Sequence, residues 1–142
     1  MIEHFHLHPM VVHFPTALFV SAAGLEIFAV VLKKEKLHSV AWINFILAVL
    51  GSVAAVVTGL LEAEHLHLVS HPVFNVHRLF GFLTAGLGVM TLALLWRLRK
   101  RSDRWFRLLF LMTLVWVTSL VSIGAYYGGR LVYEYGVGVE RD

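Results

Sequence analysis

Residues 40–61, which read VAWINFILAVLGSVAAVVTGLL, decide the fold because they form an unbroken apolar run with no charged residue. The hydrocarbon core of a bilayer is about 30 Å thick, and a helix that rises about 1.5 Å per residue crosses it in about 20 residues. Inside lipid, backbone amides must be paired within the protein, so a lone strand is excluded. The run therefore predicts a transmembrane helix.

Three more apolar stretches flank this one, at residues 10–32, 79–96 and 108–127. The composition agrees with a lipid environment, since 58% of the 142 residues are hydrophobic, against roughly 45–50% in soluble domains. Only 15% are charged, against roughly 25% in such domains. The predicted fold class is all-α, with residues 1–142 forming a single integral-membrane four-helix bundle.

The basic residues predict the orientation of these helices. Two short connections, around residues 33–36 and 97–107, carry nine of the twelve lysines and arginines. By the positive-inside rule both connections face the cytoplasm. The chain is therefore expected to be a multi-pass protein of a bacterial inner membrane, with both termini and the connection at residues 62–78 on the periplasmic side.

Composition also excludes several classes of function. The chain has no cysteine, so disulfides, thiolate catalysis, iron–sulfur ligation and covalent c-type haem attachment are excluded. The basic residues lie beside apolar spans, which indicates a lipid bilayer as the partner and no nucleic acid. No nucleophile with a neighbouring base is recognisable, so a binding or electron-transfer subunit is expected rather than an enzyme. The opening residues lack the positive region of a signal peptide, so the first span is expected to be retained.

Small residues recur at helical spacing in the predicted spans. The stripes are Ala48, Gly51, Ala55 and Gly59, then Gly81 and Ala85, then Gly124 and Gly128. Small side chains let helix backbones approach closely in lipid, so these stripes predict packing surfaces. The adjacent glycines at 128 and 129 are expected to end the fourth span, because glycine destabilises a helix interior.

Histidine is frequent for a membrane protein, with nine in the chain. Under the predicted topology, eight lie on the periplasmic side and only His38 is cytoplasmic. His13 and His77 each lie about one turn inside the periplasmic end of a helix, at similar depth. Polar residues at such positions usually face the bundle interior and have a function. His8 and His71 are further candidates.

Two imidazoles on facing helices at one depth suit a b-type haem, which four-helix bundles hold between side chains of different helices. His13 and His77 are the predicted axial ligands. The predicted haem-binding set, including two substitute ligands and two cations for the propionates, is His13, His77, His8, His71, Arg78 and Arg130. The expected function is electron transfer at the periplasmic face.

Two alternatives remain open at this point. A bare zinc, copper or iron ion is the first, since imidazole and carboxylate groups bind such metals. Its predicted ligands are His8, His13, His65, His67 and His77. The second alternative is a structural subunit of a respiratory complex with no cofactor, in which the loop histidines are tolerated interfacial residues.

Glu26 is the one acid deep in a predicted span, roughly four turns into the first helix. We expect its carboxylate to reach the headgroup region on the cytoplasmic side. The alternative is a carboxylate that is proton-linked or hydrogen-bonded across helices.

The two ends of the chain resemble a known family. Residues 8–18, HPMVVHFPTAL, resemble the opening motif HPxxVHFPxAL of the bacterial membrane-protein family called domain of unknown function 2231. Residues 128–139, GGRLVYEYGVGV, resemble its closing motif GGxLVYxxGVGV. The resemblance implies a four-helix membrane protein. Because members are sometimes joined to Rieske-type or cytochrome-like domains, it also implies redox work, with such subunits or a second copy of the chain as partners. Residues 62–67, EAEHLH, have no counterpart in these motifs.

Overall fold

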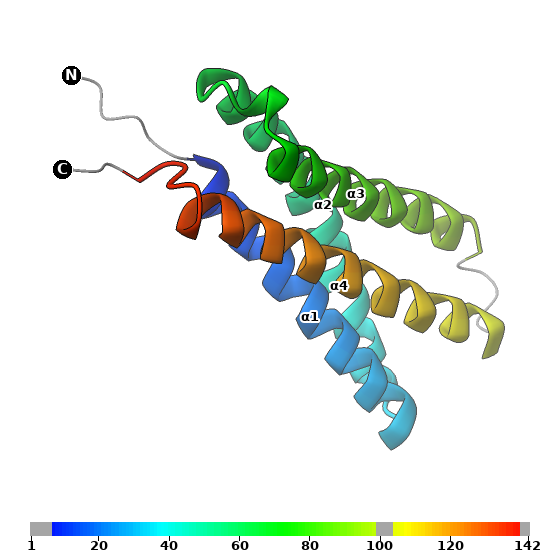
Figure 1. Cartoon of the computed structure of the whole chain (residues 1–142). Coiled ribbons are helices and arrows are strands. Elements are labelled where there is room, and N and C mark those ends of the chain that lie inside the picture. Colours follow the sequence, from blue (N-terminus) through cyan, green and yellow to red (C-terminus); the bar gives the residue numbers. More distant parts are fainter. Residues whose placement is uncertain (1–6, 99–103, 140–142) are drawn as a thin grey trace.

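The computed structural model describes residues 7–98 and 104–139, which form four α-helices, one short 3-10 helix and no strand (Figure 1). The helices are α1 (Leu7–Leu32), α2 (Glu35–His65), α3 (Pro72–Leu98) and α4 (Arg104–Tyr133), with the 3-10 helix η1 (Leu68–Ser70) between α2 and α3. All four α-helices are long and apolar enough to cross a membrane. The predicted all-α membrane bundle of four helices is confirmed.

The bundle has two chemically different ends. Figure 1 shows that α1 begins and α4 ends on the same side, where α2 also gives way to α3. We call this side the terminal end. The opposite side, where α1 turns into α2, carries Lys33, Lys34 and Arg107, and we call it the basic end.

The helices run further than the predicted spans. α3 begins at Pro72 rather than near residue 79, so His77 lies in the second turn of that helix and does not open it. Proline suits the first helical turn, where its missing N–H leaves no partner unsatisfied. The expectation that residues 128 and 129 end the fourth span is wrong, because α4 continues to Tyr133.

α4 ends instead at a left-handed glycine. Gly136 has φ 66°, its amide donates to the carbonyl of Val132, and the amide of Val137 donates to that of Leu131. This pattern closes a helix by pairing its last carbonyls. The tail then packs Val137 against a small terminal-end cluster made by Ala63 of α2, Phe74 of α3 and Leu131 of α4.

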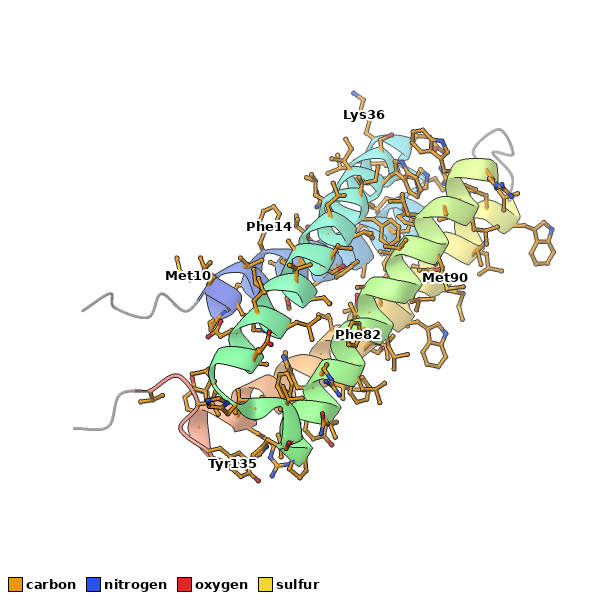
Figure 2. The ribbon with its side chains drawn as sticks, turned by 90° about the horizontal axis from the view of Figure 1, so that it is seen from above. Met10, Phe14, Lys36, Phe82, Met90 and Tyr135 are labelled. Atoms are coloured by element: carbon orange, nitrogen blue, oxygen red, sulfur yellow. The ribbon has the colours of Figure 1, made fainter. Side chains whose placement is uncertain are left out.

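The main core lies between the helices, towards the basic end. Each helix contributes a fully buried large side chain, and these are Phe19, Phe45, Leu95 and Phe110. The outer surface is apolar as well. Met10, Phe14, Phe82 and Met90 project away from the bundle (Figure 2), and all four are exposed. An apolar outer surface of this kind suits a lipid solvent.

The second helical hairpin repeats the first with a constant shift of 69 residues, which places α1 on α3 and α2 on α4. Buried Pro15, Phe19, Ala22 and Glu26 of α1 correspond to buried Thr84, Gly88, Thr91 and Leu95 of α3. Buried Ala41, Phe45, Ala48 and Ala55 of α2 correspond to buried Phe110, Leu114, Val117 and Gly124 of α4. The two hairpins therefore bury the same positions with different side chains.

The same shift relates two local features of the hairpins. His67 and Gly136, which follow α2 and α4, both have a left-handed backbone, with φ values of 53° and 66°. His8 and His77 also correspond. Because the first helix of each hairpin starts at the terminal end, the halves are parallel repeats, of the kind related by an axis along the membrane normal.

The contact between the two halves gives a test of the packing. A Cβ on Gly88 of α3 would lie 3.0 Å from Cγ2 of Val49 on α2. Overpacking a buried contact costs about 1–3 kcal/mol, whereas the gain in helix propensity from glycine to alanine is about 1 kcal/mol. Gly88→Ala is therefore expected to lower the free energy of unfolding by about 0–2 kcal/mol relative to the wild type, and by about 1–3 kcal/mol relative to Gly86→Ala, which has the propensity gain without the overpacking. Unfolding by SDS in mixed micelles measures these differences. Gly86→Ala is the matched control, because nothing lies within 4 Å of its Cβ position. Equal stability of the two variants would contradict this packing.

Candidate functional site

Two imidazoles face each other at the terminal end, one from each half of the repeat. His8 lies in the first turn of α1 and His77 in the second turn of α3. Their ring centroids are 5.7 Å apart, and the planes are nearly perpendicular, at 80°. Both side chains are half-buried. The structure thus joins the two halves through a pair of equivalent histidines.

Each imidazole is held by a main-chain carbonyl of the second helix in its own half. His8 Nδ1 lies 2.9 Å from the carbonyl oxygen of Ala55, and His77 Nδ1 lies 2.8 Å from that of Gly124. A carbonyl can only accept a hydrogen bond, so Nδ1–H is the donor in both rings. In the neutral ring Nε2 then keeps its lone pair, and metal-binding histidines are typically oriented by such a bond.

A glycine one turn further along the same helix makes room for each ring. A Cβ on Gly59 would lie 3.0 Å from Cε1 and Nδ1 of His8. A Cβ on Gly128 would lie 3.1 Å from Cε1 of His77. Glycine allows the backbone to approach a ring this closely. These small-residue positions, predicted only as packing surfaces, therefore also seat the two histidines.

Glu62 distinguishes the first half from the second. Its Oε2 accepts a hydrogen bond from the backbone N–H of His8 at 3.1 Å, which satisfies a free amide at the start of α1. The corresponding residue in the second half is Leu131, which is buried. A carboxylate therefore lies beside one histidine of the pair and not beside its equivalent.

The structure does not bring His13 to His77. His13 is exposed, and its Nδ1 lies against the carbonyl of Pro9 in its own helix. The predicted pairing of His13 with His77 is corrected to His8 with His77. Five residues of α-helix turn the side-chain direction by about 140°, so His8 and His13 face different sides of α1.

The other predicted ligands are His71, His67 and His65. His71 precedes α3 and contacts the ring of Tyr135, with centroids 4.6 Å apart. His67 is exposed after α2, and the side chain of His65 lies outside the described residues. Within residues 7–98 and 104–139, no group of three or more histidine, aspartate or glutamate side chains is arranged to hold a metal ion.

Arg78 and Arg130, the two cations predicted to bind the haem propionates, lie at the terminal end, and each interacts with another side chain. The guanidinium of Arg78 lies 5.8 Å from the ring centre of Phe74. Arg130 donates to both carboxylate oxygens of Glu134, at 2.7 to 2.9 Å. These bonds hold the pKa of the Glu134 carboxyl below its ordinary value. The charge of Arg130 is therefore already compensated in this structure.

Sequence reasoning misplaced Glu26. The side chain is completely buried, and His38 Nδ1–H of α2 donates to its Oε2 at 2.7 Å. The expected contact with headgroups is wrong, and the alternative of a hydrogen bond across helices is confirmed. Glu26 continues the buried stripe of Phe19 and Ala22 at helical spacing. That periodicity was the available signal for its burial.

Comparison with known proteins identifies one family. The family model described as "Predicted membrane protein (DUF2231)" matches residues 4–141. No curated protein and no solved structure matches the chain significantly.

Proposed function

Because the chain belongs to the DUF2231 family of predicted membrane proteins, we propose that it works within a bilayer, binding b-type haem between its two halves and transferring electrons. The observation that carries this proposal is the facing pair of His8 and His77, each anchored through Nδ1 to a helix carbonyl. Haem carries the redox-active iron, and the protein would supply its axial ligands and the surrounding dielectric.

The spacing of the two rings supports one shared metal centre. With metal–nitrogen bonds of about 2.0–2.1 Å, two imidazoles on opposite sides of one ion have centroids about 6 Å apart. The centroids of His8 and His77 are 5.7 Å apart. A six-coordinate haem needs only two protein ligands, whereas a bare ion usually needs three or four. The described residues supply two imidazoles at this point, which favours haem.

Glycine and aromatic residues lie around the pair. Gly59 and Gly128 let α2 and α4 approach the two rings closely, which supports a fixed orientation of both imidazoles. Phe80 stacks against Tyr127, with planes 8° apart, close to Gly124. We assign the axial ligands to His8 and His77. Arg78, and Arg130 after release from Glu134, remain the proposed partners of the propionates.

We infer the location from the charges at the two ends. Lysines and arginines at the basic end support a cytoplasmic position of that end by the positive-inside rule. The histidine pair would then lie at the periplasmic face of a bacterial inner membrane. Electrons would pass there to a Rieske-type or cytochrome-type partner subunit, or to a second copy of the chain.

A bare metal ion is the second candidate, and Glu62 is the reason to keep it. Its carboxylate bonds to the main chain of His8, so a small side-chain movement could add an oxygen ligand to the two imidazoles. Zinc, copper or iron would suit this mixed set.

A reduced-minus-oxidised visible spectrum, recorded on membranes and on the purified protein with metal analysis of the same samples, tests the proposal. We expect sharp bands of a six-coordinate b-type haem with about one iron per chain, because the described chain offers one such pair. Stoichiometric zinc or copper without these bands would select the second candidate. Neither bands nor metal in membranes measured before extraction would contradict both and indicate a structural subunit.

A further inference from the structure

A second buried polar site lies far from the histidine pair, near the basic end. It consists of Glu26 on α1 and His38 on α2, joined by the 2.7 Å hydrogen bond. Along α1, Glu26 is about 27 Å from His8 at about 1.5 Å per residue. The ring of His38 packs edge-on against Phe106 and Phe110 of α4, at centroid distances of 6.4 and 5.7 Å.

One carboxylate oxygen of this pair has no partner. Glu26 Oε1 is buried without a hydrogen bond in the described part of the protein. An unpaired buried carboxylate oxygen destabilises the folded state. A purely stabilising role for Glu26 therefore does not account for it. An unpaired buried acceptor beside an imidazole therefore points to a group that changes its protonation.

The repeat shows that the fold does not require this pair. The residue corresponding to Glu26 in the second half is Leu95, which is also completely buried. The residue corresponding to His38 is Arg107, which pairs with Glu35 and not with Leu95. A hairpin of the same shape is thus stable with leucine at this position, and apolar replacements of buried ion pairs are often neutral or stabilising.

A groove lies at the basic end of the bundle. It has a volume of about 430 Å³ and is lined by Val30, Lys33, Glu35, Arg107, Leu108 and Leu111. Val30 lies one turn beyond Glu26 on α1, and Arg107 directly follows Phe106, which contacts His38. The groove is therefore about one helical turn from the pair, and His38 itself is partly exposed, with 19% of its side-chain surface accessible.

We propose that Glu26 and His38 form a proton-binding site that exchanges one proton with water at the basic end. The proton adds to the lone pair of His38 Nε2, and the resulting imidazolium keeps its Nδ1–H donated to the Glu26 carboxylate. Other charged groups at this level are Lys33 on α1, Glu35 on α2 and Arg107 on α4, which line the groove, and Arg97 on α3, which is exposed. Glu26 is the anion in direct contact and stabilises the charged ring.

Nitrogen NMR of the full-length protein, labelled with ¹⁵N-histidine in detergent or nanodiscs, tests this site. The His38→Phe spectrum assigns the His38 signals, and the sample is titrated from about pH 5 to about pH 9, the range in which imidazoles change charge. The Nε2 signal of His38 is expected to move from its protonated to its neutral position. In Glu26→Gln the pH of this change is expected to differ from that in the wild type, because the contacting anion is gone.

The other histidines serve as internal controls for this titration. A His38 signal that stays fixed while other histidine signals of the same sample move would overturn the proposal and leave a permanent structural hydrogen bond. A titration unchanged by Glu26→Gln would overturn it as well.

The double variant Glu26→Leu/His38→Phe, which replaces both partners, separates a proton-binding role from a structural one. Since Leu95 fills the position corresponding to Glu26 and no imidazole is left unpaired, this variant is expected to unfold at the same or a higher temperature than the wild type. A fall of several degrees would show that the pair is structural and contradict the proposal. Haem content is expected to be unchanged, because the two sites lie at opposite ends of α1, so this test stands whether or not haem is bound.

Discussion

His8→Ala and His77→Ala are each expected to abolish the b-type haem spectrum in membranes that contain normal amounts of the protein. Loss of a group that merely orients a metal ligand lowers affinity by about 10- to 100-fold, so loss of the ligand itself is expected to exceed that range. The repeat leads to a second expectation, which concerns the relative size of the two effects. Because the two rings have equivalent carbonyl bonds and equivalent glycines, the two variants are expected to lose haem to a similar degree. Haem absorbance per amount of protein is the measurement.

His13→Ala is the matched control for these variants. It removes an imidazole from the same helix, one that is exposed and bonded within its own helix. It is expected to keep full haem content. If His13→Ala lost the haem and His8→Ala kept it, the assignment of His8 would be wrong, even with the cofactor correct.

Sequence reasoning predicted the fold because the membrane constrains it strongly. In lipid, long apolar runs form helices because their backbone amides must be paired within the protein. The run at residues 40–61 was sufficient by itself to predict a membrane protein, and the other three runs gave the number of helices. The limits of the helices were harder to predict. α3 begins several residues before its apolar run, because helices extend through the interfacial region, where hydropathy no longer distinguishes helix from loop.

The facing pair of histidines was predicted only in part, since His77 was singled out together with His13, and His8 was named only as a further candidate. His8 and His13 both belong to the opening motif, and both lie near the start of α1. Which of them faces α3 depends on the rotation of α1 about its axis, and tertiary packing sets that rotation. The exposed side of α1 is itself apolar, as Met10 and Phe14 show, so hydropathy does not mark the inner face.

The repeat escaped sequence reasoning because most of its buried and half-buried positions carry different residue types in the two halves, and only a few, such as His8 and His77, carry the same one. Phe19 corresponds to Gly88 and Glu26 to Leu95. In lipid, close packing depends on complementary sizes, so a large residue in one half can face a small one in the other. The differences between the halves are informative in turn, since Glu26 and Glu62 both correspond to buried leucines of the second half, Leu95 and Leu131.

Gly59→Leu and Gly128→Leu are expected to remove the haem while leaving both histidines in the chain. Even a Cβ at these positions would come within 3.0 to 3.1 Å of an imidazole atom, and a leucine would occupy the space of the ring. The ring must then leave its carbonyl, so its Nε2 no longer points along the direction that the carbonyl bond fixes. Alanine variants at both positions provide a graded series, in which a displacement of a few tenths of an ångström is expected to weaken binding without abolishing it.

Gly81→Leu on α3 controls for adding a leucine to a helix of this bundle, because nothing lies within 4 Å of its Cβ position. It is expected to keep the haem. If Gly59→Leu retained as much haem as Gly81→Leu, the ring of His8, which packs against Gly59, would not be a haem ligand. If only one of the two site variants lost the haem, one half alone would hold the cofactor. Equal losses at Gly59 and Gly128 would instead mean that the cofactor is bound between two equivalent halves, as the repeat requires.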